Sequence, residues 1–169
     1  MTQITQIKTE TANKVSDNQT NEQFLHQGLT RDIIGVFYQV YNELGHGFIE
    51  SVYENALCIA LREKGCEVHQ QIAIPVWFRG KKIGDFDADL LINKTVLLEL
   101  KVARAIEQAH IAQLLNYLKA TPIEVGLLLN FGSRPEFKRV VFGNSRKICN
   151  PIEAPSDIFQ SVSSESSAV

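Results

Sequence analysis

The sequence predicts an α/β domain in which a mixed central sheet is flanked by helices. Apolar residues recur every three or four positions in two early segments, which is typical of helices. A period of two follows, which is typical of strands. A third helical segment then separates these strands from two more and supplies the crossover that a parallel strand pair needs. The expected order is helix-helix-strand-strand-strand-helix-strand-strand.

Three helices are expected. In the first, Thr30 is a candidate N-cap, and apolar positions step by three and four as far as Leu44, before the glycines Gly45 and Gly47. The second covers about residues 49–64, with Gly65 as its C-terminal stop. The third covers about residues 105–119, and Pro122 lies just beyond it.

Five strands are expected. The first runs from Val68 to Val76, and a turn at residues 79–82 leads into the second, over residues 83–92. A tight turn at Asn93 and Lys94 leads into residues 95–101, whose nearly continuous Val and Leu predict a central strand. Residues 125–131 and 137–142 are the last two strands.

Composition places the chain among ordinary globular proteins. It has 169 residues, with 17 Lys and Arg against 19 Asp and Glu. It contains no apolar run near the roughly 20 residues that span a bilayer, and its opening residues lack a signal-peptide pattern. Its three cysteines form no CxxC pair. We therefore expect a cytoplasmic protein with free thiols and no membrane partner.

Both ends of the chain are poor in apolar residues. Residues 1–27 are expected to be a disordered arm, and residues 153–169 a serine-rich flexible tail, because such segments cannot offset the entropy of ordering. The folded domain is expected at residues 28–152. Residues 99–147 carry eight basic against four acidic side chains, so we expect a nucleic-acid face there that includes Lys138 and Arg139.

The densest polar signal is a run of carboxylates on the second and third strands. Asp87 and Asp89 are two apart, as are Glu99 and Lys101, so each pair is expected to share a strand face. The turn at residues 93–94 brings Glu99 level with Asp87 or Asp89. Carboxylates this close repel one another, and oxygen ligands at this density favour Mg²⁺ or Mn²⁺. Lys101 would lie beside the ion.

A metal site is one of several structures that these residues can form. Charged strand residues are most often the solvated face of a sheet, although Glu99 and Lys101 lie in an apolar strand where unpaired charge is costly. A calcium loop starting at Asp85 fails, because Leu90 replaces the required glycine. The chain has no GxSxG, GxxxxGK, GxGxxG or HExxH motif. His110, Gln113 and Tyr117 share one helical face, which suits a functional stripe and a solvated one equally well.

Four motifs resemble a known family. Asp89 followed by Glu99-Leu100-Lys101 resembles the D…(D/E)xK signature of the PD-(D/E)XK nuclease superfamily. Residues 47–53, Gly-Phe-Ile-Glu-Ser-Val-Tyr, resemble the GxxExxY motif of a family of small bacterial proteins within it. Residues 113–117 are similar to a QxxxY motif, and residues 128–132 also resemble the GxxExxY family. Ala88 stands where the name-giving proline would be, but that proline is not a ligand.

The resemblance implies a restriction-endonuclease-like core and a role for each motif residue. Asp89 and Glu99 would bind the metal together with the Leu100 carbonyl, and Glu50 would reach in from the second helix. Lys101 would be the catalytic lysine. Gln113 and Tyr117 would orient the site or contact the nucleic-acid backbone.

Two functions stay open at this stage. One is a Mg²⁺- or Mn²⁺-dependent nuclease that hydrolyses phosphodiester bonds by metal-activated water attack, with DNA favoured over RNA as the partner. The other is a non-catalytic nucleic-acid-binding or protein-interaction module that keeps the nuclease fold, since fold and activity separate readily. A homodimer is open in both cases.

Overall fold

A computed structural model describes residues 25–147. Residues 1–24 of the expected arm, the whole expected tail, and the last five residues of the expected domain lie outside this range. The helices and strands, in chain order, are α2 (Gln27–Leu44), α3 (Glu50–Glu63), β1 (Val68–Phe78), β2 (Lys81–Ile92), β3 (Val96–Lys101), α4 (Gln108–Ala120), β4 (Val125–Asn130) and β5 (Glu136–Val141). A short 3₁₀ turn, η1 (Asn144–Arg146), follows.

The strands form one mixed sheet in the order β1-β2-β3-β4-β5. β3 and β4 are parallel, and the other three neighbouring pairs are antiparallel. α4 provides the crossover between the parallel strands, as the sequence predicts. The expected α/β fold is confirmed, including the order of its elements.

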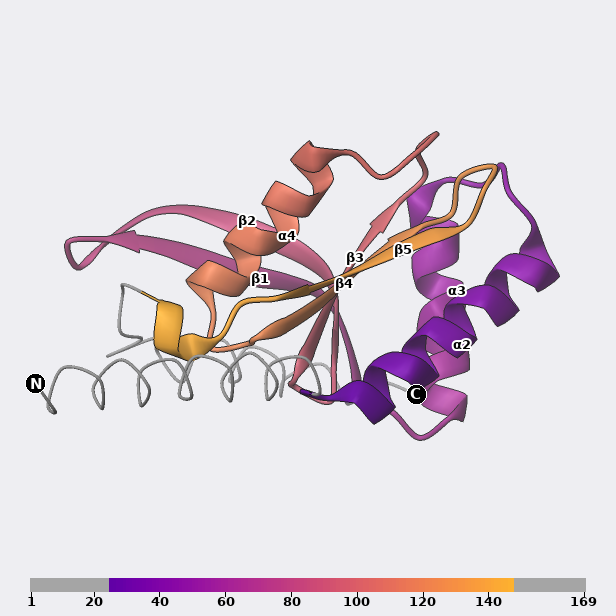
Figure 1. Ribbon diagram of the computed structural model, residues 1–169, viewed down its shortest axis with the longest axis horizontal. Helices are drawn as coiled ribbons and strands as arrows, with labels where there is room; N and C mark the ends of the chain where they lie inside the picture. The colour runs from indigo at the N-terminus through magenta and orange to yellow at the C-terminus, as the bar shows by residue number, and fades with distance from the viewer. Residues whose placement is uncertain (1–24, 148–169) are drawn as a thin grey trace, which may run out of the picture.

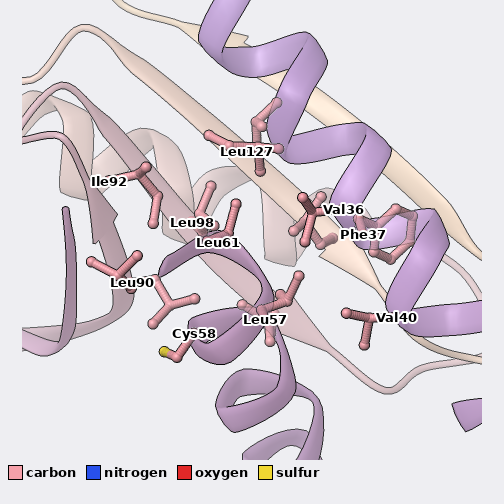
Figure 2. Close-up of a cluster of buried hydrophobic side chains, with 14 of the residues drawn as sticks. Val36, Phe37, Val40, Leu57, Cys58, Leu61, Leu90, Ile92, Leu98 and Leu127 are labelled. Carbon is pink, nitrogen blue, oxygen red and sulfur yellow. The ribbon is translucent and has the colours of Figure 1, made fainter. Parts of the chain in front are cut away.

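α2 and α3 cover one face of the sheet (Figure 1). Their apolar positions meet those of β2, β3 and β4 in a single buried cluster, part of which Figure 2 shows. Phe37 of α2 and Tyr53 of α3 both contact Phe131, which follows β4, with ring centroids 4.8 and 4.3 Å away. Aromatic contacts of this kind add stability beyond the area they bury. The loop after β4 is thereby joined to both helices.

α4 covers the opposite face through a second, smaller cluster. Leu114, Tyr117 and Leu118 are its buried side chains. The Leu114 side chain lies over Gly126 of β4, where an added Cβ would come within 2.7 Å of it. Glycine at this position lets α4 pack closely on β4.

Two helix starts differ from the sequence predictions. Thr30 lies inside α2, where its hydroxyl donates to the Gln27 carbonyl, so the predicted N-cap role is wrong. The helix begins earlier because Leu25 and Leu29 also pack against the core. α4 starts three residues later than predicted, at a capping box in which Glu107 bonds the His110 backbone and His110 Nδ1 accepts the Glu107 N–H.

Arg139 of β5 has a structural partner. Its Nη2 donates to the Leu25 carbonyl at 2.6 Å, and burial lowers its pKa. The guanidinium therefore anchors the chain just before α2. Of the two basic residues expected to contact nucleic acid, only Lys138 is exposed. Among the described helices, none combines the length and apolar character needed to cross a bilayer.

The β1–β2 hairpin is much longer than the rest of the sheet. β1 has 11 residues and β2 has 12, whereas β3, β4 and β5 have six each. Its turn residues Arg79 and Gly80 both have positive φ, of 49° and 73°, as a two-residue type I′ turn requires. In Figure 1 the hairpin extends beyond the ends of the other strands.

Candidate active site

Glu99 and Lys101 lie on the side of β3 that faces α4. Leu97, two residues earlier, packs in the α4-side cluster, and alternation carries the same orientation to Glu99 and Lys101. Glu99 is only 2% exposed, and its Oε1 lies 2.6 Å from Lys101 Nζ. Its other oxygen, Oε2, is buried without a hydrogen-bond partner. A buried carboxylate oxygen of this kind is costly unless a proton or a cation satisfies it.

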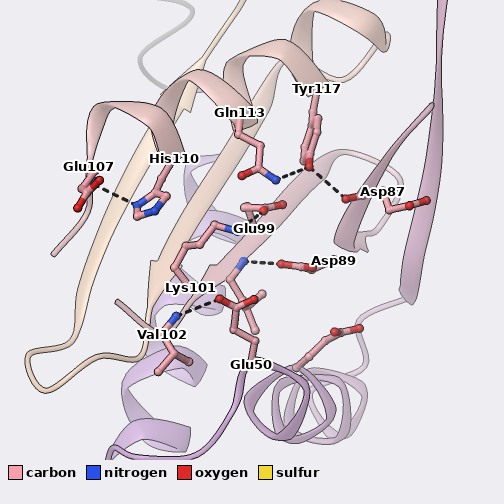
Figure 3. A network of polar contacts seen from close by, with 12 residues as sticks. Glu50, Asp87, Asp89, Glu99, Lys101, Val102, Glu107, His110, Gln113 and Tyr117 are labelled. Carbon is pink, nitrogen blue, oxygen red and sulfur yellow. Dashed lines mark hydrogen bonds and ion pairs between the residues drawn. The ribbon is translucent and has the colours of Figure 1, made fainter. Parts of the chain in front are cut away.

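Asp89 meets β3 where the β2–β3 ladder opens. The paired residues run from Ile92 with Val96 to Leu90 with Leu98, which places Asp89 level with Glu99, as the turn predicts. Beyond that pair, Asp89 Oδ2 accepts the Leu100 N–H at 2.6 Å (Figure 3). The carboxylate thus replaces a backbone acceptor, which fixes it beside the strand that carries Glu99.

The alternation of β2 is interrupted at Asp89. Ala88 and Leu91 both pack in the α4-side cluster, although residues three apart face opposite sides in a regular strand. β1 changes faces in the same way. Val68 packs in the cluster under α2 and α3, whereas Ile72 packs in the α4-side cluster, and Gln71 between them has a φ of 53°. The prediction that Asp87 and Asp89 share a face relied on unbroken alternation, and that assumption fails here.

Glu50 opens α3 and approaches the end of β3. Its Oε1 accepts the Val102 N–H at 3.3 Å. The loop before it is fixed by Tyr53, whose hydroxyl donates to the Gly45 carbonyl at 2.8 Å and accepts the Phe48 N–H at 3.3 Å. In the GxxExxY pattern, Tyr53 therefore supports the fold, and Glu50 is the residue directed at the site.

Glu54 is a carboxylate near the site that the sequence analysis missed. It is buried one turn after Glu50, and Gln71 Nε2 lies 3.1 and 3.0 Å from its two oxygens. Gln70 Nε2 adds a third contact at 3.2 Å. Because residues four apart share a helix face, the spacing from Glu50 was a usable signal for Glu54.

The three charged side chains of the signature have shifted pKa values. Burial raises the pKa of Glu99 to about 7, and the neighbouring charge of Asp89 acts in the same direction. Burial also raises the pKa of Asp89, against the hydrogen bond from Leu100. Burial acts to lower the pKa of Lys101, but the hydrogen bond and charge of Glu99, with the charges of Glu50 and Asp89, outweigh it and raise that pKa. The cluster thus holds more negative charge than Lys101 alone stabilises.

Gln113 and Tyr117 reach the same region from α4 (Figure 3). Gln113 Nε2 donates to Tyr117 Oη, which in turn donates to the Asp87 carbonyl at 3.1 Å. Burial raises the pKa of Tyr117. The pair ties α4 to β2 two residues before Asp89. His110, on the same helical face, serves the capping box.

Asn130 and Gly132 fix the segment after Lys101. Asn130 is fully buried, and its side chain accepts the Ala103 N–H at 2.9 Å and donates to the Ala103 carbonyl at 3.0 Å. A Cβ on Gly132 would stand 1.9 Å from that carbonyl oxygen, so only glycine fits. The Lys101 carbonyl also accepts the Phe131 N–H. These contacts give residues 128–132 a structural role beside the candidate site.

The donor set suits a hard divalent cation, although its oxygens are not gathered into a finished coordination shell. Within residues 25–147, no three His, Cys, Asp or Glu side chains stand close enough together to surround a metal ion. One Asp89 oxygen is held by Leu100 and one Glu99 oxygen by Lys101. The unpartnered, buried Glu99 Oε2 is the feature that fits a cation.

Comparison with known proteins identifies the family. Residues 27–140 match the family model of the PD-(D/E)XK nuclease superfamily. The chain belongs to this superfamily. Assignment to the narrower GxxExxY family stays a prediction.

Solved structures also include chains similar to this one. The crystal structure of SSO0001 aligns with a TM-score of 0.44 and 23% identity, over 55% of this chain and 50% of that one. The chain thus spans about half the length of SSO0001. No curated protein matches the sequence.

Proposed function

We propose that this PD-(D/E)XK protein is a metal-dependent nuclease whose site consists of Asp89, Glu99 and Lys101, with Glu50 beside them. The observation that carries the proposal is Glu99: a nearly fully buried carboxylate with one oxygen on Lys101 Nζ and the other without a partner. Purely structural needs would be met better by an apolar side chain at such a position. The superfamily match supplies the reaction class.

The proposed roles follow from the chemistry of each group. Asp89, Glu99 and Glu50 would hold Mg²⁺ or Mn²⁺, with the Leu100 carbonyl as a further oxygen. A divalent cation bound there would supply Lewis acidity toward the phosphate and ease deprotonation of the attacking water. Lys101 would donate to a phosphoryl oxygen and stabilise the charge that develops as the water oxygen bonds to phosphorus and the leaving oxygen departs. Gln113 and Tyr117 would orient the site.

The finer assignments also belong to this proposal. We favour DNA over RNA as substrate, place the folded domain at residues 28–152, and assign the chain to the GxxExxY branch. A homodimer remains open. The second candidate function, a non-catalytic binding or interaction module, is favoured by one observation: no carboxylate triad in the described residues is already arranged around an ion position.

Cleavage assays with matched lysine variants test the proposal. Plasmid DNA, single-stranded DNA and RNA would each be incubated with the protein in Mg²⁺, Mn²⁺ or EDTA. We expect metal-dependent cleavage that Lys101→Met lowers by about a hundredfold or more, the scale of losing one charge-stabilising donor. Lys94→Met is the control, because Lys94 is an exposed turn residue at the other end of β3.

Two results would contradict nuclease activity. One is cleavage that persists in EDTA or in Lys101→Met, which would point to a contaminating enzyme. The other is nucleic-acid binding without hydrolysis under any metal condition, which would establish the binding-module alternative.

A further inference from the structure

The tip of the β1–β2 hairpin, residues 77–83, carries large apolar side chains that are exposed. Trp77, Phe78 and Ile83 are 46%, 58% and 64% exposed. β3 pairs with β2 only from Leu90 to Ile92, so residues 81–89 have no strand on that side. A hairpin that projects from its sheet with bulky apolar side chains at the end is suited to contact another molecule.

Basic side chains lie between these apolar ones along the chain. Arg79, Lys81 and Lys82 lie in the turn and its flanks, against one acid, Asp85, which pairs with Lys82 at 2.7 Å. The Arg79 guanidinium lies over the Phe78 ring, 5.1 Å from its centroid. The tip thus combines π faces with positive charge, and two copies of it would repel each other.

The hairpin leads directly to the candidate active site. β2 runs from Lys82, the register partner of Trp77, to Asp89, a span of seven residues. At about 3.3 Å per residue this is roughly 23 Å, close to the length of seven nucleotides at their stacked spacing of about 3.4 Å. A nucleic-acid strand bound at the tip would therefore need about seven nucleotides to reach Asp89 and Glu99.

We propose that residues 77–83 bind single-stranded nucleic acid, with bases stacked on Trp77 and Phe78 and phosphates bound by Arg79 and Lys81. The inference rests on the nuclease function proposed above and specifies its substrate as a strand with unpaired bases. Bases inside a duplex present no free face to a side chain, whereas those of a single strand stack readily on aromatic rings. A second copy of the chain fits the tip less well, because its charges would repel.

The tryptophan provides a direct probe of this contact. The chain has one tryptophan, Trp77, so its emission reports on the hairpin tip alone. Titration of the full chain with oligo-dT of 20 nucleotides in EDTA should quench the emission, because a stacked base contacts the indole. A blunt duplex of the same length should quench it little. Lys94→Met should be quenched like wild type, since Lys94 is an exposed turn residue outside the tip and outside the candidate active site.

Matched variants measure how much the tip contributes to affinity. Trp77→Ala with Phe78→Ala should weaken the binding of fluorescein-labelled oligo-dT, measured by anisotropy, by about tenfold to a hundredfold, which is about 1.4 to 2.7 kcal/mol. Arg79→Gln with Lys81→Gln should reduce the slope of log affinity against log salt by about 1.4. Phe137→Ala, which truncates an exposed Phe on β5 at the opposite edge of the sheet, should change neither quantity.

The outcomes separate this inference from the proposed nuclease activity. Quenching and aromatic-dependent affinity without any cleavage would support the tip site and defeat the nuclease. Cleavage that Lys101→Met abolishes, with no Trp77 quenching and unchanged affinity in the double-alanine variant, would support the nuclease and overturn the tip site. Equal quenching by the duplex, or a dimer in sedimentation that the double-alanine variant dissolves, would also overturn it.

Discussion

The two halves of β2 differ sharply in their surroundings. Residues 81–87 are all exposed, whereas residues 88–92 are buried apart from half-buried Asp89. Leu90, Leu91 and Ile92 of the buried half pair with β3 as well as with β1, whereas the exposed half pairs only with β1. Asp89 lies at the boundary, where alternation breaks and the β2–β3 ladder opens. β2 thereby holds the Asp89 carboxylate at the edge of the core and continues from there into the exposed hairpin.

The largest expected effect distinguishes the two halves by stability. Leu90→Ala should lower the free energy of unfolding by about 2–5 kcal/mol, because Leu90 is fully buried and the truncation leaves a cavity. Ile83→Ala, in the exposed half, should change it by less than about 0.5 kcal/mol. Urea unfolding followed by circular dichroism measures both. Equal losses would show that the hairpin packs against something as closely as the core does.

The next effect is the pH dependence of stability that Glu99, on β3 opposite Asp89, should cause. Glu99 has a folded pKa of about 7, above its usual 4.5, so its protonation stabilises the fold below pH 4.5, and that stabilisation disappears as the pH rises through 7. Glu99→Gln removes this dependence. In EDTA the variant should match wild type near pH 4 and exceed its free energy of unfolding by about 2–3 kcal/mol at pH 8.

Urea unfolding at a series of pH values checks this prediction. Glu63→Gln is a suitable control for loss of a carboxylate, since Glu63 is exposed at the end of α3. A wild-type protein whose stability rises from pH 5 to pH 8 relative to Glu99→Gln would contradict the raised pKa.

A smaller effect is expected for the contact that ties α4 to the boundary. Tyr117→Phe removes the hydrogen bonds to Gln113 and to the Asp87 carbonyl and should cost about 1 kcal/mol of stability. The cleavage rate should fall by a larger factor than the stability loss alone would cause, because Tyr117 holds the Asp87 carbonyl, two residues before Asp89. Tyr38→Phe, at a partly buried tyrosine of α2, is the control for both readouts. A rate loss equal to that of the control would remove Tyr117 from the site.

The features that the sequence could predict are those marked by regular spacing of residues along the chain. The strong periodicities gave the fold and the order of the elements. The turn at Asn93 and Lys94, which both have positive φ, set the register that brings Asp89 level with Glu99. The same logic could have found Glu54, four residues after Glu50. These features depend on local sequence, so they can be read without knowing the tertiary structure.

Other features depend on contacts between distant segments. The change of face around Gln71 and Asp89 occurs on both paired strands, and no local pattern marks it. The Thr30 cap was wrong because Leu25 and Leu29 extend α2 through packing on the core. The bonds of Asn130 to Ala103 join segments 27 residues apart. Burial of Glu99 was suggested by its apolar strand, but its unpartnered oxygen required the packed structure.

Thermal unfolding in the presence of metal tests the central claim most directly. If Asp89 and Glu99 bind Mg²⁺ or Mn²⁺ in the native state alone, a hundredfold excess over the dissociation constant should stabilise the wild type by about 2.7 kcal/mol and raise its melting temperature. Glu99→Gln should show no such rise, and Lys101→Ala should keep it while losing cleavage. A wild-type melting temperature that Mn²⁺ leaves unchanged at every concentration, or raises equally in Glu99→Gln, would contradict a metal site at these residues.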